Sequence, residues 1–386
     1  MSLYYFDHAA SAPRREEVFA AMAPYLQGVV GNPSGTHRAA RSARRAIEEA
    51  RDEIAAFLDV APGGVILTAG GTESCHLALT GVTKRFRREH GAAEIIVSPV
   101  EHHAVLESAK DLAAQYDDVT VHFVPVDADG VVDLEALGHL LGPRTAIVSV
   151  MTANNETGVC QPVNAVGDAV RSLAPGAASH SDAVAAAPWL NLVHETSNLD
   201  LISICAHKLG GPVNAGALAM RSTLNLDAVV SGGGQERGRR GGTVDVAAAV
   251  GLAAAVRATA RERDSAVRAT SQRQRRLEKF MTSIPGVQIT APNATRLPGH
   301  VHLTVEGVSS DEMLFLLDQA GVCASAASSC SSGAVIASHV LAAMGVPAAR
   351  ARGALRFTMG AETTDDDVVV LENVFAETVR RLRAEE

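Results

Sequence analysis

A lysine and an aspartate, each at the end of an apolar run, are well placed to do chemistry. Lys208 stands in the segment Ala-His-Lys-Leu-Gly-Gly at 206–211, just after the run 199–204, and Asp182 ends a short run 26 positions upstream. A lysine amine can bond the aldehyde of pyridoxal 5′-phosphate, and a carboxylate can pair with its ring nitrogen. Alone, most lysines are solvated and most strand-end aspartates serve turns or caps. The pair therefore indicates this cofactor only if the surrounding residues agree.

Two glycine-containing segments suit an anion. Residues 68–73, Thr-Ala-Gly-Gly-Thr-Glu, are typical of a strand end, a turn and a helix start. Free N–H groups at a helix N-terminus can hold a cofactor phosphate, although ordinary strand-to-helix turns share this pattern. Residues 231–243 contain six glycines and three arginines. That composition fits a mobile surface loop or an anion-facing loop, and we favour the second interpretation.

Three further side chains suit catalysis or substrate binding. Cys330 lies among small polar residues at 328–333, which is more typical of an accessible nucleophile than of a core cysteine. Arg356 interrupts an apolar strand, where a guanidinium either pairs structurally or clamps a carboxylate. His102 and His103 follow a glutamate at a strand-to-helix junction. A pair of histidines suggests a metal site, but no third ligand is apparent nearby. We interpret His102 as a ring that stacks on a cofactor or carries a proton.

The composition is that of a globular enzyme. Of 386 residues, 47% are hydrophobic and 20% charged, and the formal net charge of -9 argues against a nucleic-acid-binding surface. No apolar run reaches 18 residues, and no secretion signal is visible. Five cysteines without a Cys-x-x-Cys pair disfavour disulfides and zinc, and Cys75, Cys160 and Cys323 have apolar neighbours typical of a core. We expect a cytoplasmic protein that binds no metal and no membrane.

Alternating strand and helix patterns must position these side chains. Strand patterns at 65–68, 94–97, 119–124 and 146–150 alternate with helix patterns that include 72–88 and 102–115. This alternation predicts a mainly parallel sheet covered on both faces. A helix over 244–284, apolar first and then charged, predicts a connector to a small α+β unit with strands near 301–304 and 354–357.

Short motifs run in a fixed order nearly from end to end of the chain. They occupy residues 5–10, 31–34, 70–74, 101–102, 154–156, 182–183, 207–208, 232–243, 328–333, 338–341 and 355–357. The series resembles the NifS/IscS-type cysteine desulfurases, group V of the aspartate-aminotransferase-like pyridoxal-phosphate enzymes. The resemblance implies the α/β fold-type I architecture. A large cofactor-binding domain over 16–259 would join a small α+β domain of 1–15 and 260–386, which carries the substrate arginine and the cysteine loop.

The resemblance assigns most of the site to pyridoxal 5′-phosphate. Lys208 would bond the cofactor, Asp182 would pair with its ring nitrogen, and His102 would stack on the ring and relay protons. The cofactor phosphate would be surrounded by residues from several segments: Gly71, Thr72, Cys205, His207 and, from the partner subunit, Thr243.

The same resemblance implies L-cysteine as the substrate and an enzyme-bound persulfide as a product. Asn155 would face the ring hydroxyl and the substrate, while Arg356 would clamp the substrate carboxylate. Cys330, on a mobile loop of the longer type, would attack the sulfur and release L-alanine. A homodimer that hands sulfur to acceptor proteins, without direct nucleic-acid binding, is expected. Iron–sulfur cluster assembly, tRNA thiolation, thio-cofactor synthesis and sulfur modification of DNA all employ this family, and the sequence does not choose among them.

The sequence departs from the family pattern at four places. The glutamine that donates to the ring hydroxyl is Ala185, and the phosphate-binding serine is Cys205. The Gly-Pro-Lys-Gly turn differs at 213–214, and the Glu-Pro after the cysteine loop differs at 336–337. A lost neutral hydrogen bond costs about 0.5–1.5 kcal/mol, which predicts a weaker or specialised desulfurase. The alternatives are a group V lyase, aminotransferase or epimerase, which needs no Cys330, and a weakly active scaffold paralogue.

Overall fold

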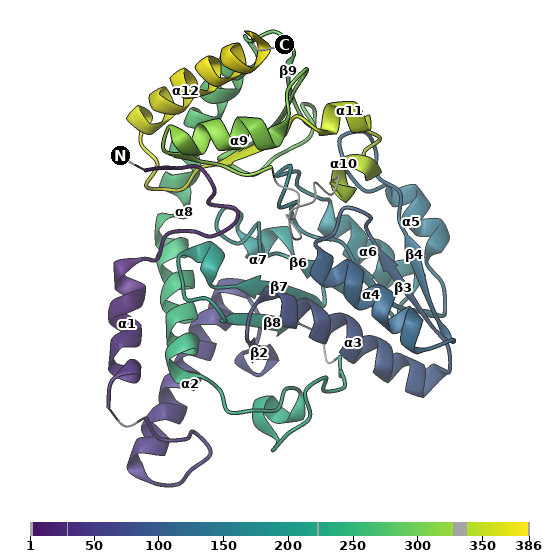
Figure 1. The fold of residues 1–386 in the computed structure, drawn as a ribbon. Helices are drawn as coiled ribbons and strands as arrows, with labels where there is room; N and C mark the ends of the chain where they lie inside the picture. The colour runs from purple at the N-terminus through teal and green to yellow at the C-terminus, as the bar shows by residue number, and fades with distance from the viewer. Residues whose placement is uncertain (1–2, 29, 222–223, 327–337, 385–386) are drawn as a thin grey trace.

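The computed structural model describes residues 3–28, 30–221, 224–326 and 338–384 (Figure 1). Figure 1 shows a lower part built on a central sheet and an upper part made by the C-terminal elements, with α8 (Val246–Met281) running from one to the other. Asp245 caps this helix, because its side chain accepts a hydrogen bond from the N–H of Ala248 at 3.0 Å.

A seven-stranded sheet forms the centre of the lower part, in the order β2-β8-β7-β6-β5-β3-β4. Its neighbours from β7 to β4 are parallel, whereas β8 is antiparallel to both β2 and β7. Strands β5 to β8 are buried along their whole length, as expected for strands covered on both faces. The strands are β2 (Val65–Thr68), β3 (Ala93–Val97), β4 (Val119–Phe123), β5 (Thr145–Ser149), β6 (Ala178–Asp182), β7 (Leu201–Cys205) and β8 (Gly216–Met220).

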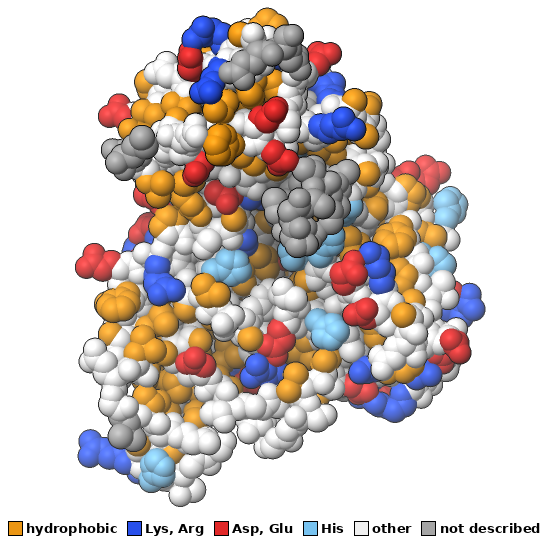
Figure 2. Space-filling view, viewed as in Figure 1, with side chains coloured by type: hydrophobic (Ala, Val, Ile, Leu, Met, Phe, Trp, Pro, Cys, Tyr) orange, Lys and Arg blue, Asp and Glu red, His pale blue; other side chains and the backbone are white. Residues whose placement is uncertain are grey.

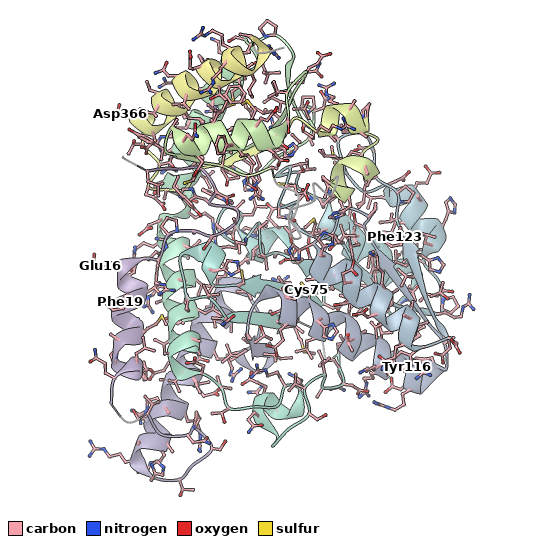
Figure 3. All side chains as sticks on the ribbon, viewed as in Figure 1. Glu16, Phe19, Cys75, Tyr116, Phe123 and Asp366 are labelled. Carbon is pink, nitrogen blue, oxygen red and sulfur yellow. The ribbon has the colours of Figure 1, made fainter. Side chains whose placement is uncertain are left out.

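Helices cover both faces of this sheet. On one face α3 (Gly71–His90) and α4 (His103–Gln115) share an apolar core that includes Cys75, which Figure 3 places inside the molecule. On the other face α2 (Arg38–Leu58), α6 (Val163–Leu173) and the first half of α8 share a second core. α1 (Glu16–Leu26) packs closely on α8, since a Cβ on Gly251 would lie 2.7 Å from the sulfur of Met22. Its Phe19 points outward in Figure 3 and is 58% exposed.

A three-stranded antiparallel sheet, in the order β12-β10-β9, forms the upper part. Its strands are β9 (Val287–Ile289), β10 (His300–Val305) and β12 (Ala354–Thr358), and α9 (Ser310–Gln319) and α12 (Asp365–Ala384) pack against it. β1 (Tyr4–Tyr5) pairs in parallel with β11 (Val322–Cys323), which brings the N-terminal segment to this part. The remaining short elements are α5 (Leu134–Leu140), α7 (Leu192–Glu195), α10 (His339–Ala343), α11 (Ala348–Ala351) and the 3₁₀ turns η1 (Pro62–Gly64), η2 (His207–Leu209) and η3 (Gln235–Gly238).

The mainly parallel sheet with helices on both faces, and the smaller α+β part, confirm the predicted α/β architecture. The predicted helix over 244–284 is shorter at both ends, as α8. The domain boundary at 259–260 stays a prediction. No helix in the described ranges combines the length and the apolar character needed to cross a bilayer. Cys160 and Cys323, expected in the core, are only partly buried, whereas Cys75 is fully buried.

Candidate active site

Several of the predicted site residues lie at one edge of the large sheet. Lys208 lies on η2 after β7, Asp182 is the last residue of β6, Asn155 follows β5, and His102 precedes α4. In open α/β sheets, ligands bind outside the carboxyl ends of the strands. Figure 2 shows several histidine side chains near the junction between the upper and lower parts of the molecule.

Lys208 is held by the N-terminal segment. Its Nζ donates hydrogen bonds to the backbone oxygens of Ala9 and Ala10, the latter at 2.7 Å. Burial lowers the pKa of Lys208 and Arg356 lowers it further, although Cys205 and carboxylates including Asp182 oppose this shift. A lowered pKa raises the fraction of free amine, which is the form that bonds an aldehyde.

The N-terminus of α3 lies against the loop that follows Asp182. This aspartate is 6% exposed, and its Oδ1 accepts a hydrogen bond from the N–H of Val184 at 2.9 Å. A Cβ on Gly71 would lie 2.8 Å from Cγ2 of Val184, and the preceding Gly70 has a φ of 146°. Both positions therefore favour glycine. The first turn of α3, including exposed Thr72, leaves N–H groups available for an anion.

Cys205 and His207 complete this end of the site. Cys205 is fully buried at the end of β7, with its Cβ 3.7 Å from the position of a Cβ on Gly71. Burial raises the pKa of Cys205 to about 12, so the thiol stays protonated and is only a weak donor. Its sulfur lies 3.8 Å from Nε2 of His207. Burial, with a contribution from Lys208, lowers the pKa of His207 to about 4, so this ring is neutral at pH 7.

His102 caps α4. Its Nδ1 accepts a hydrogen bond from the N–H of Ala104 at 3.0 Å, so the proton of the neutral ring belongs on Nε2. Part of the side chain is exposed to solvent. Loss of water around the ring nevertheless lowers the pKa of His102, and the negative charge of Asp182 opposes this shift. Glu101 beside it is fully buried, and burial raises its pKa well above the usual range. Its Oε1 accepts a hydrogen bond from the N–H of Met151 at 2.6 Å.

Arg356 joins the upper sheet to the loop after β5. One guanidinium nitrogen donates to Oδ1 of Asp7 at 2.7 Å, and another donates to the backbone oxygen of Asn155, also at 2.7 Å. The side chain is 6% exposed, and its Nε has no hydrogen-bond partner among the described residues. A guanidinium held in this way is suited to bind a carboxylate.

Sequence reasoning missed three polar residues beside this arginine. Asp7 holds the guanidinium, and Glu156 lies next to Asn155 with 4% exposure. Burial raises the pKa of Glu156 to about 7, against the effects of Ser338 and Arg356. Oε2 of Glu156 accepts a hydrogen bond from the hydroxyl of Ser338 at 2.5 Å. The motifs at 5–10, 154–156 and 338–341 marked these segments but gave the three side chains no role.

One predicted site residue, Thr243, does not lie beside Lys208. Thr243 is exposed and lines a small hollow with Thr68 and Arg240. Cys330 lies outside the described residues. In the glycine-rich segment, Arg240 pairs with Glu73 at 2.8 Å. An anion-facing role of that segment therefore stays a prediction, and so does the contribution of Thr243 from a partner.

Comparison with known proteins gives concordant matches. The family model for class-V aminotransferases matches residues 4–371. The IscS-like cysteine desulfurase of Mycobacterium tuberculosis is 40% identical over 385 residues, which cover 98% of this chain and 97% of that protein.

Solved structures agree. A NifS-like protein superposes with a TM-score of 0.89 at 31% identity, covering 97% of this chain and 99% of that one. A structure of SspA in complex with cysteine superposes with a TM-score of 0.81 at 29% identity, covering 94% of this chain and 100% of that one.

Proposed function

Because this chain belongs to the class-V aminotransferase family and, within it, to the cysteine desulfurases, we propose that it binds pyridoxal 5′-phosphate at Lys208 and transfers the sulfur of L-cysteine to Cys330. The observation that carries the proposal is the convergence of Lys208, Asp182 and the α3 N-terminus at one edge of the sheet. L-Cysteine is the substrate, in keeping with the cysteine bound in the related SspA structure.

The residues at this edge fit the cofactor. A Cβ on Gly71 would fill the space against Val184, so glycine keeps the approach to the α3 N–H groups open for a phosphate. Asp182 offers a buried carboxylate for the ring nitrogen, and Lys208 offers an amine with a lowered pKa. When bound, the cofactor supplies an electron sink for bonds at the substrate's α-carbon.

The side chains around that position bind the substrate and move protons. Arg356 binds the substrate carboxylate through its guanidinium, which Asp7 and the backbone oxygen of Asn155 already hold in place. In His102, Nδ1 accepts the hydrogen bond from the N–H of Ala104, which leaves Nε2 as the ring nitrogen free to contact a ligand. The lowered pKa of this histidine keeps the ring neutral at pH 7 with the proton on Nε2, so His102 acts as a base only through Nδ1, when that nitrogen gives up the N–H of Ala104.

Cys330 is the sulfur acceptor in this proposal. The carbon–sulfur bond of L-cysteine breaks while a sulfur–sulfur bond forms on Cys330, so L-alanine and an enzyme persulfide account for all atoms without an external oxidant. The persulfide then passes to an acceptor protein. We place the enzyme in the cytoplasm, where a reducing environment keeps such a thiol free, and we propose a homodimer in which Thr243 reaches the partner's phosphate site.

Borohydride reduction followed by peptide mass mapping tests the attachment to Lys208. Reduction fixes the cofactor to the amine that it was bonded to, so the peptide containing Lys208 should gain the cofactor mass. Lys84, which also lies on a helix near the sheet, is the internal control and should stay unmodified. Purified protein without a visible cofactor band, or with the added mass elsewhere, would overturn the proposal. A group V lyase or aminotransferase would pass this test but would not release sulfur from L-cysteine.

A further inference from the structure

A cavity of about 470 Å³ lies beside Lys208, between the N-terminal segment, α8 and the loop after β12. This volume is within the range of small-molecule sites, about 300–1,000 Å³. The cavity shares Lys208 with the candidate active site, but Asp182, His102 and Arg356 are not among the described residues that line it. The cavity therefore adjoins the candidate active site at Lys208 and extends away from Asp182 and His102.

Two buried polar side chains on the cavity wall have no hydrogen-bond partner among the described residues. His300, at the start of β10, is 3% exposed, and its ring nitrogens lack a well-formed hydrogen bond, with only the backbone of Pro298 close to one of them. Thr259, within α8, is also 3% exposed, and its hydroxyl is unpaired. Leaving a buried polar group unpaired is unfavourable. Two such groups on one wall point to an occupant that carries a hydrogen-bonding group.

The chemistry of these two groups restricts that occupant. Burial lowers the pKa of His300 to about 3, so its ring is neutral at pH 7 and offers one donor and one acceptor. The Thr259 hydroxyl can likewise donate and accept. A ligand hydroxyl matches both groups.

The charges elsewhere on the wall are mostly paired. Arg15 forms an ion pair with Glu262, and His8 contacts Glu362 at 3.0 Å. Arg14 is exposed on the lining and has no recorded carboxylate partner among the described residues. A positive charge is therefore left at the open side of the cavity, where it can attract an anion.

The body of the cavity is apolar and one wall is flat. Trp189 and Pro188 lie on the loop after β6, and Leu209 and Met359 add further apolar surface. Ala185 is also on the wall, at the position where the resembled family has glutamine. A glutamine there would extend into the space that alanine leaves open. An aromatic ring would pack well against the indole of Trp189.

We propose that this cavity binds a small aromatic carboxylate that carries a hydroxyl at its far end. The hydroxyl pairs with His300 and Thr259, the ring packs on Trp189, and the carboxylate faces Arg14. The cavity adjoins the reaction site at Lys208, but binding of this ligand does not require that sulfur transfer takes place.

Trp189 is the single tryptophan of the chain, so its fluorescence reports occupancy of the cavity directly. The probe is 4-hydroxyphenylacetate, titrated into the protein with its cofactor bound. The excitation wavelength is longer than those that the phenol absorbs, so that only Trp189 is excited. We expect saturable quenching with a Kd of about 1 mM or tighter. Phenylacetate lacks the hydroxyl and 4-hydroxybenzyl alcohol lacks the carboxylate, so each should bind about two- to tenfold more weakly.

Thr259→Val removes the hydroxyl and keeps the shape of the side chain. It should weaken 4-hydroxyphenylacetate about two- to tenfold and leave phenylacetate unchanged. The matched control is Thr83→Val, since the Thr83 hydroxyl is also buried and unpaired but lies on α3, away from the cavity. Ala185→Gln should reduce the affinity for every probe by filling the cavity.

Absence of saturable quenching would overturn the proposal, because the cavity would then hold water only. Equal affinity of the Thr259→Val and Thr83→Val variants for 4-hydroxyphenylacetate would overturn it as well, since the hydroxyl contact would be missing. These readouts come from Trp189, so a negative result here is distinguishable from a failure to form a cofactor bond at Lys208.

Discussion

At the scale of single residues, Glu156 is a carboxyl group in a setting that disfavours its charge. Burial raises its pKa from 4.5 to about 7, despite the hydrogen bond from Ser338 and the nearby Arg356. The folded protein therefore binds the proton more tightly than the unfolded chain does. Between pH 4.5 and about 7 the folded state carries more protons, so the contribution of Glu156 to stability falls as the pH rises through this window.

Glu156→Gln should remove this part of the pH dependence, because an amide keeps the oxygen that accepts from Ser338 but does not titrate. Between pH 5 and pH 8, wild type should lose about 2–3 kcal/mol more unfolding free energy than the variant loses. Denaturant unfolding at the two pH values measures the difference. Glu49→Gln, on the exposed side of α2, is the control and should behave as wild type. Parallel pH profiles for wild type and Glu156→Gln would contradict the assignment.

At the scale of elements, the cofactor cradle depends on how closely α3 approaches the loop after β6. Gly71→Ala places a Cβ 2.8 Å from Cγ2 of Val184, so either the helix start or that loop must shift. We expect about a tenfold loss of pyridoxal-phosphate affinity, measured by absorbance titration of the apoenzyme, because one misplaced phosphate contact is worth about 1.4 kcal/mol.

Gly176→Ala is the matched control for this change. A Cβ at Gly176 meets nothing within 4 Å, and the residue is exposed far from the site. The control should bind the cofactor as wild type does. An unchanged affinity in Gly71→Ala would show that the phosphate does not lie at the α3 N-terminus.

Local sequence patterns predicted most of the helices and strands that position the site. They predicted few of the contacts between side chains within the site. Asp182 ends a strand while Lys208 and His102 follow strands, and parallel strands bring such positions to one edge. The pairing of Arg356 with Asp7 joins residues 349 positions apart, which no local pattern reveals. The unpaired state of His300 also depends on packing between distant segments. Burial of the Glu156 carboxyl likewise follows from the assembled structure and not from its neighbours in sequence.

At the scale of the whole molecule, the proposal requires Thr243 to act across a subunit interface. Within one chain, Thr243 is exposed and does not contact Lys208. Co-expression of a Lys208→Ala chain with a Thr243→Asp chain tests this arrangement. The Thr243→Asp subunit keeps its own Lys208 and would receive Thr243 from the other subunit, so one intact site per mixed dimer should restore alanine formation.

Each homodimeric variant alone should be inactive or nearly so, because one lacks the attachment lysine and the other places a carboxylate against the phosphate. A mixed dimer as inactive as its two parents would mean that Thr243 serves its own chain, and an active Thr243→Asp homodimer would mean that it serves no site. A strictly monomeric protein on sedimentation would contradict the dimer itself.

The central claim is that Cys330 receives sulfur from L-cysteine, and simultaneous measurement of L-alanine and enzyme persulfide tests it most directly. Wild type and the control Cys323→Ala should both form alanine and persulfide, since Cys323 lies on β11 and has no assigned role. Cys330→Ala should keep the visible cofactor band but lose both products. Persulfide and alanine formation that persists in Cys330→Ala, or a coloured wild type that leaves L-cysteine unchanged, would contradict the account.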